Sequence, residues 1–131
     1  MPNENIKLNF AHICDLAFLS QNGKANIIGI FRTIYSPNFP VKHPKFSVIT
    51  SFTVLNFVGK HKQTIKIIRE EDKKEIGPII NVDFEVKDEK QELNFLGDII
   101  GIGFEKPGNY SIKIFFDENE IYSIPFDVIK S

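Results

Sequence analysis

The stretch FEKPGNYSIKIFFDENEIYSIPFDV, which runs from Phe104 to Val128, contains the pattern that decides the fold of this chain. It opens with Pro107-Gly108, a dipeptide typical of turns, because proline restricts φ and glycine accepts positive φ. Apolar residues then alternate with mostly polar ones, and they are Tyr110, Ile112, Ile114 and Phe116. An alternation with period two indicates a β-strand with one buried face. A three-residue loop from Glu118 to Glu120 sets this strand against the apolar residues of 121–128, which predicts a β-hairpin.

Segments of the same kind recur along the whole chain. Counted from the N-terminus they are 8–20, 25–36, 46–57, 61–70, 79–87, 93–104, 110–117 and 121–128. No segment of helical length carries apolar residues at helical spacing. Short strands separated by turns, without helices between them, are typical of stacked sheets. The sequence therefore predicts one all-β domain over residues 1–131, an antiparallel two-sheet β-sandwich of the immunoglobulin-like or C2-like type with about eight strands.

A second hairpin is predicted at Asn22-Gly23, the strongest short hairpin signal in the chain. If these two residues form the whole loop, Phe18 lies opposite Ile27 on one face of the ladder. On the other face, Asp15 and Arg32 become diagonal neighbours of opposite charge. This sheet-face pair is one candidate surface for recognition.

Composition narrows the function classes. The chain has 131 residues and a formal net charge of −1, so it offers no electrostatic case for nucleic acid or an anionic membrane as a partner. It has no apolar run long enough to span a bilayer, and its first residues do not form a secretory signal. A single cysteine, Cys14, allows no internal disulfide. We expect a soluble cytoplasmic protein that binds neither nucleic acid nor membrane.

Residues that could carry chemistry are sparse. His12 and Cys14 share a strand face but lack further metal ligands, and no nucleophile signature surrounds Cys14. The glycines of 101–103 are not followed by a helix N-terminus, which a phosphate site requires. We therefore expect no catalytic residue, no metal site, no cofactor and no enzyme activity. The acidic loops 87–92 and 117–120 leave a calcium-dependent ligand open.

The connection 36–45 is the most distinctive surface feature, because it contains three prolines that stiffen it. A stiff loop loses little conformational entropy when it binds a partner. Four residues in and beside it are the candidate partner-binding residues, Tyr35, Phe39, Val41 and His43. The alternative is a crossover between sheets whose Phe39 closes one end of the core.

The first third of the chain carries a recognisable set of motifs. They are Asp15, the segment GKANIIGIF from Gly23 to Phe31, the step Phe39-Pro40, and HPKF from His43 to Phe46. In these motifs, residues 11–48 resemble a family of small uncharacterised bacterial all-β proteins of unknown function. The resemblance implies an all-β sandwich and no reaction.

Together these features predict a non-catalytic protein-binding or assembly module in a bacterium or phage, with a protein partner or self-association. The alternative is a sandwich that binds a small ligand, either a carbohydrate or a calcium-dependent one.

Overall fold

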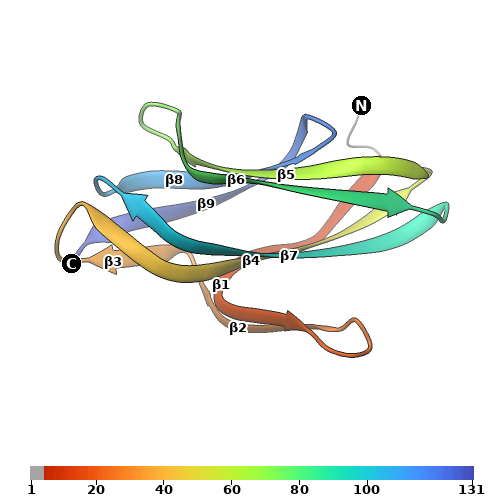
Figure 1. The fold of residues 1–131 in the computed structure, drawn as a ribbon, viewed down its shortest axis with the longest axis horizontal. Helices are drawn as coiled ribbons and strands as arrows, with labels where there is room; N and C mark the ends of the chain where they lie inside the picture. Colours follow the sequence, from red (N-terminus) through yellow and green to blue (C-terminus); the bar gives the residue numbers. More distant parts are fainter. Residues whose placement is uncertain (1–4) are drawn as a thin grey trace.

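The structure is a computed structural model, which describes residues 5–131. This part of the chain contains nine strands and no helix (Figure 1). The strands are β1 (Ile6–Leu19), β2 (Ala25–Phe31), β3 (Thr33–Ser36), β4 (Val41–Leu55), β5 (Gly59–Arg69), β6 (Lys74–Val86), β7 (Lys90–Phe104), β8 (Gly108–Phe116) and β9 (Asn119–Lys130). Over residues 5–131 there is accordingly no helix that could cross a membrane.

The strands form two sheets that face one another. Sheet A has the order β2-β1-β4-β7, and sheet B has the order β3-β9-β8-β5-β6. The predicted all-β architecture with two sheets is confirmed. Every neighbouring pair is antiparallel except β3 and β9, which run parallel from Thr33 opposite Asp127 to Ser36 opposite Lys130. The prediction of a wholly antiparallel arrangement is therefore wrong at this edge of sheet B.

The ninth strand arises because the predicted strand 25–36 divides at Arg32, so that β2 joins sheet A and β3 joins sheet B. The backbone oxygen of Arg32 accepts a hydrogen bond of 2.8 Å from the amide of Asp127 in β9. Its guanidinium donates back to the backbone oxygen of Ala11 in β1, at 3.2 Å. Arg32 is thus bonded to both sheets, which explains why the chain changes sheet at this residue.

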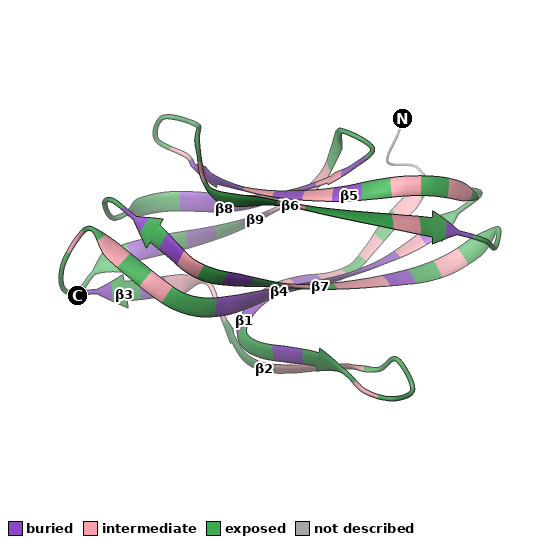
Figure 2. Cartoon of the chain, in the orientation of Figure 1, coloured by how far each residue is buried: buried purple, intermediate pink, exposed green. Residues whose placement is uncertain are grey.

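Large apolar side chains from both sheets fill the space between them. Figure 2 shows that buried positions occur along the strands of both sheets. Phe52 of sheet A lies with its ring centroid 5.1 Å from that of Phe116 in sheet B, and Phe46 lies 6.4 Å from Phe126. The alternating residues of β8 are all buried, with exposures of 0–1 %; they are Tyr110, Ile112, Ile114 and Phe116. The alternation predicted from the sequence is confirmed for this strand.

The turn between β8 and β9 differs from the predicted one. Asp117 and Glu118 both have positive φ, 50° and 72°, which makes a two-residue turn of the type that matches the twist of a hairpin. A bulge between Ile114 and Phe115 then sets Ile114 opposite Tyr122. The predicted three-residue loop is wrong, and it misplaces the pairing by two residues. This shift applies from Ile114 back to Gly108, beyond the bulge, and because it is even, the side chains there keep their predicted faces.

The turn between β1 and β2 is longer than predicted. The amide of Gly23 donates to the oxygen of Ser20, and the amide of Ser20 donates to the oxygen of Lys24, both at 2.8 Å. Gly23 has a φ of 77°, so the three residues 21–23 form the loop. Leu16 consequently lies opposite Ile28, and the predicted pairing of Phe18 with Ile27 is wrong by one residue. An odd shift reverses the faces of one strand relative to the other.

The second half of β1 and its partner β2 extend beyond the two packed sheets. β1 pairs with β4 only as far as Cys14, and from Ile13 onward it pairs with β2. We call residues 15–31 the arm; it lies beyond sheet A as a separate layer (Figure 1). Its inner side covers the outer face of sheet A with a second, smaller apolar cluster: Cys14, Ala17 and Ile49 are buried there, and Phe10, Ala25 and Ile27 pack against them.

Candidate functional site

The arm begins at a sharp bend where Asp15 crosses Gly29. Gly29 has a φ of 71°, a conformation that favours glycine. A Cβ atom placed on it would lie 2.4 Å from Oδ2 of Asp15 and 3.0 Å from its Cβ. The backbone of β2 therefore approaches Asp15 as closely as only glycine permits. This contact sets the angle at which the arm leaves sheet A.

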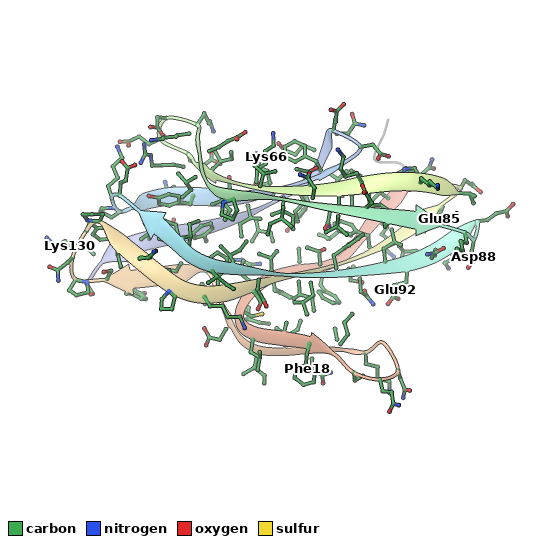
Figure 3. All side chains as sticks on the ribbon, viewed as in Figure 1. Phe18, Lys66, Glu85, Asp88, Glu92 and Lys130 are labelled. Atoms are coloured by element: carbon green, nitrogen blue, oxygen red, sulfur yellow. The ribbon has the colours of Figure 1, made fainter. Side chains whose placement is uncertain are left out.

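The outer side of the arm is apolar and faces water. Leu16, Phe18 and Ile28 expose 42 %, 46 % and 54 % of their surface. Leu16 lies directly opposite Ile28, and Phe18 follows two residues later on the same strand face. Ile30, at 53 %, extends the exposed apolar surface towards the base. Leu19 is 42 % exposed but lies on the strand face of Ala17, opposite Ala25. Figure 3 shows Phe18 on the arm, away from the two packed sheets.

Scattered single apolar residues are normal on protein surfaces, but contiguous ones are not. The five exposed side chains of the arm come from two paired strands of one short hairpin. The arm also contains only two charged residues, Asp15 at its base and Lys24 beside its tip. A side with this composition resembles the centre of a protein–protein interface, where charged residues are depleted.

The structure brings some of the predicted partner-binding residues together near the base of the arm. Tyr35 and His43 line a shallow pocket of about 360 Å³, together with Asp15 and residues 29–31 of β2. Tyr35 is 66 % exposed and lies in β3 at the edge of sheet B. His43 contacts the aromatic rings of Phe31 and Phe46, with centroids 6.4 and 5.7 Å away. Tyr35 is the one of this pair that is free to contact a partner.

The other two predicted residues contribute to packing, and their binding to a partner stays a prediction. Phe39 and Val41 are partly buried and pack against the main core. The connection itself is shorter than predicted, because β4 begins at Val41 and only residues 37–40 lie between the strands. This arrangement corresponds to the alternative reading, in which Phe39 closes one end of the sandwich.

Asp15 and Arg32 lie on opposite strands of the hairpin, near its base. Both are among the described residues, and they form no ion pair with each other. Asp15 lies against Gly29, while the guanidinium of Arg32 donates to the backbone oxygens of Ala11 and Phe31. The one-residue change in the register of the hairpin explains this separation, because it removes the diagonal relation. Arg32 is a structural residue here.

Cys14 and His12 lie under the arm, on the outer face of sheet A. Cys14 is fully buried, and burial raises the pKa of its thiol, so that it stays protonated and unreactive. Burial, with a smaller effect of the Arg32 charge, lowers the pKa of His12. Within residues 5–131, no three histidine, cysteine or acidic side chains lie close enough together to hold a metal ion. Cys14 therefore packs the arm against the sheet.

A second pocket, of about 640 Å³, lies near the start of β5, around His61 and Asp117. Nδ1 of His61 lies 2.5 Å from Oδ2 of Asp117, and its Nε2 lies 2.8 Å from the backbone oxygen of Phe57. Oδ1 of Asp117 accepts the amide of Lys62 at 2.9 Å. Both nitrogens of His61 are thus occupied by protein oxygens. The pair fastens two turns together and leaves no free nitrogen to act as a general base.

The sequence interpretation missed the apolar surface of the arm. Its signal was present, because the segments around Leu16–Leu19 and Ile27–Ile30 carry apolar residues at consecutive positions. A strand that is apolar on both faces requires cover on both faces. Sheet A covers the inner face of the arm, and the described chain provides no cover for the outer one.

Comparisons with known proteins concern the fold and the family. No curated protein sequence matched the chain. Among solved structures, the chain is similar to "Pseudomonas fluorescens alkylpurine DNA glycosylase AlkC bound to DNA containing an abasic site analog", at 8 % identity and a TM-score of 0.54. This similarity covers 95 % of the present chain but only 30 % of that chain, and it is a likeness of fold alone. Residues 9–129 match "Family of unknown function (DUF6941)", which confirms the predicted resemblance to a family of unknown function and extends it over nearly the whole chain. The chain therefore belongs to the DUF6941 family.

Proposed function

We propose that this protein is a non-catalytic protein-binding or assembly module whose binding surface is the outer side of the arm. One observation carries this proposal: four large apolar side chains lie exposed on the outer side of a hairpin that has only two charged residues, Asp15 and Lys24. Burial of such a surface against a partner is favourable in proportion to the apolar area that leaves water. The protein keeps this area in water instead, which is the usual property of an interaction site.

The arm is also built to hold this surface in place. Its inner side is anchored to sheet A through the buried cluster of Cys14, Ala17 and Ile49. Its bend is restricted by the close contact between Gly29 and Asp15. A surface that is already ordered loses little conformational entropy on binding, which favours a partner over water.

We also propose a cellular location and a type of β-sandwich for this protein. We place the protein in the cytoplasm of a bacterium or in a phage-infected cell, where the buried free thiol of Cys14 stays reduced. We assign the two facing sheets to the immunoglobulin-like or C2-like type of sandwich, which their face-to-face arrangement supports. The DNA named with the similar solved structure is not carried over to this chain, because a net charge of −1 does not favour binding to phosphates.

Site-specific photocrosslinking tests the proposal. A benzophenone amino acid is placed at Phe18 on the arm or, as the matched control, at Ile79 on β6 of sheet B, which is 49 % exposed. Each full-length variant is irradiated in an extract of its source cell, and adducts are identified by mass spectrometry. We expect one discrete protein adduct from position 18 and none from position 79. Equal labelling from both positions, or no protein adduct from position 18, would contradict the proposal.

A further inference from the structure

We infer that the partner that covers the arm is a second copy of this chain, in a two-fold dimer whose two arms pack antiparallel, outer side against outer side. This inference rests on the proposed function, because it names the occupant of the same surface. Three features of the arm carry it: its flat two-stranded shape, the placement of its two charges, and the size of its apolar surface.

The shape of the apolar surface fits another flat strand pair. Leu16, Phe18 and Ile28 lie on the side of a hairpin and not in a groove that a helix or a single extended peptide would fill. Two strand layers pack face to face at about 10 Å with their side chains interdigitated. The tip, residues 20–23, is polar and uncharged, so it has neither the apolar nor the basic side chains that would insert into a lipid surface.

The charges of the arm favour a symmetric antiparallel arrangement. Asp15 lies at the base and Lys24 beside the tip, both are exposed, and neither forms an ion pair with another described residue. In an antiparallel two-fold dimer the tip of each arm lies beside the base of the other. Lys24 of each copy then lies beside Asp15 of its partner, and both contacts are attractive. Because the interface is isologous, this one relation occurs twice.

The area is that of a reversible dimer. The four exposed apolar side chains of the outer side, Leu16, Phe18, Ile28 and Ile30, present on the order of 400 Å², about half of the roughly 800 Å² that each partner contributes to a standard stable interface. The polar side chains and backbone of the two strands add to this area when the arms pack. We therefore expect association that depends on protein concentration, and not a permanent dimer.

Sedimentation velocity of the full chain over about a hundredfold range of concentration around the micromolar tests the inference. We expect a monomer–dimer equilibrium for the wild type. Ile28→Lys places a cation in the centre of the interface and should raise the dissociation constant at least about tenfold. Ile79→Lys makes the same change at a similarly exposed isoleucine of sheet B and should leave the equilibrium unchanged. Circular dichroism and melting temperature establish that each variant is folded.

A charge exchange tests the antiparallel arrangement itself. Lys24→Asp sets two carboxylates together at each end of the dimer and should weaken it. The double variant Asp15→Lys with Lys24→Asp restores opposite charges and should recover dimerisation in a homodimer. A double variant that is folded but no tighter than Lys24→Asp alone overturns the antiparallel arrangement.

The outcomes separate this inference from the proposed function. A wild type that stays monomeric over the whole range overturns the dimer. If that monomer still crosslinks from position 18 to a different protein, the arm is a binding surface for that protein and only the self-association is wrong. If Ile79→Lys weakens the dimer as much as Ile28→Lys does, the association does not use the arm. Crosslinking from position 18 to a second copy of the chain supports both statements.

Discussion

Replacement of Gly29 by alanine should destabilise the protein, and the structure separates the two causes. The first cause is the backbone, since a φ of 71° is unfavourable for any residue with a Cβ atom. The second cause is the contact with Asp15, whose Oδ2 and Cγ atoms would lie 2.4 and 2.8 Å from the new methyl group. Atoms cannot approach so closely, so the carboxylate must leave its present rotamer.

The change in the free energy of unfolding follows from these two costs and from one gain in the unfolded chain. The positive φ costs an alanine about 1–2 kcal/mol. The displaced Asp15 side chain adds about 0.5–1.5 kcal/mol. The loss of glycine flexibility in the unfolded chain returns about 0.4–1 kcal/mol. We expect a net decrease of about 0.5–3 kcal/mol in the free energy of unfolding, of which the clash with Asp15 is the part specific to this site.

Two variants isolate the contribution of the clash. Gly23 in the loop has a nearly equal φ of 77°, but no heavy atom lies within 4 Å of a Cβ built on it. Gly23→Ala therefore measures the backbone cost alone and should be the milder change. Asp15→Ala removes the two closest atoms, so Gly29→Ala should cost less in that background than in the wild type.

Urea unfolding followed by far-ultraviolet circular dichroism measures the wild type, the three single variants and the double variant, since the chain has no tryptophan for fluorescence. We expect a coupling energy of about 0.5–1.5 kcal/mol between positions 15 and 29. Equal losses for Gly23→Ala and Gly29→Ala, together with additivity within about 0.3 kcal/mol, would show that Asp15 does not contact the bend of the arm.

Three further predictions concern the sandwich. Phe116→Ala removes a side chain packed between aromatic rings of both sheets and should cost about 3–5 kcal/mol in urea unfolding; a cost below about 1 kcal/mol would contradict the described core. Gln63 is buried, its Oε1 has no hydrogen-bond partner among the described residues, and its Nε2 donates to the hydroxyl of Thr50 at 3.4 Å. The double change Gln63→Met and Thr50→Val should therefore leave the free energy of unfolding unchanged or raise it, whereas Thr50→Val alone should lower it by about 1 kcal/mol. The hydrogen bond from Lys73 lowers the pKa of Glu70 from 4.5 to about 2. The ionised carboxylate of Glu70 therefore stabilises the folded state fully above pH 4.5, and this contribution disappears as the pH falls through 2. Glu70→Gln should lack this component, and parallel stability curves for the two proteins between pH 5 and 2 would refute it.

The interior of the sandwich could be predicted because its signal is local. In β8, every second residue from Tyr110 to Phe116 is buried as the alternation indicated. The geometry of the turns is harder to predict from the sequence. The two positive φ values at Asp117 and Glu118 occur without glycine or asparagine, so composition gave no sign that the turn would be so tight. The even shift preserved the faces there, while the odd shift at Gly23 did not.

The partner-binding residues are predicted from the stiffness of the connection, and nothing in the fold tests whether they bind a partner. Phe39 and Val41 contact the core, because the short connection between β3 and β4 lies over one end of the sandwich. Alternation does not predict the arm, because it places one face of every strand in the main core. Leu16 and Ile28 belong instead to strands whose inner face is buried outside that core, against the back of sheet A.

The sequence by itself determined that this chain forms strands, which side chains point inward along most of them, and where the chain turns. These properties depend on residues close together in the chain, and a period of two is visible in any short segment. Only the tertiary structure decided that Arg32 divides one predicted strand between two sheets, that β3 runs parallel to β9, and that the arm covers sheet A with one face in water. Those choices depend on contacts between residues far apart in sequence, such as Asp127 with Arg32 and Ile49 with Ala17, which no local pattern specifies.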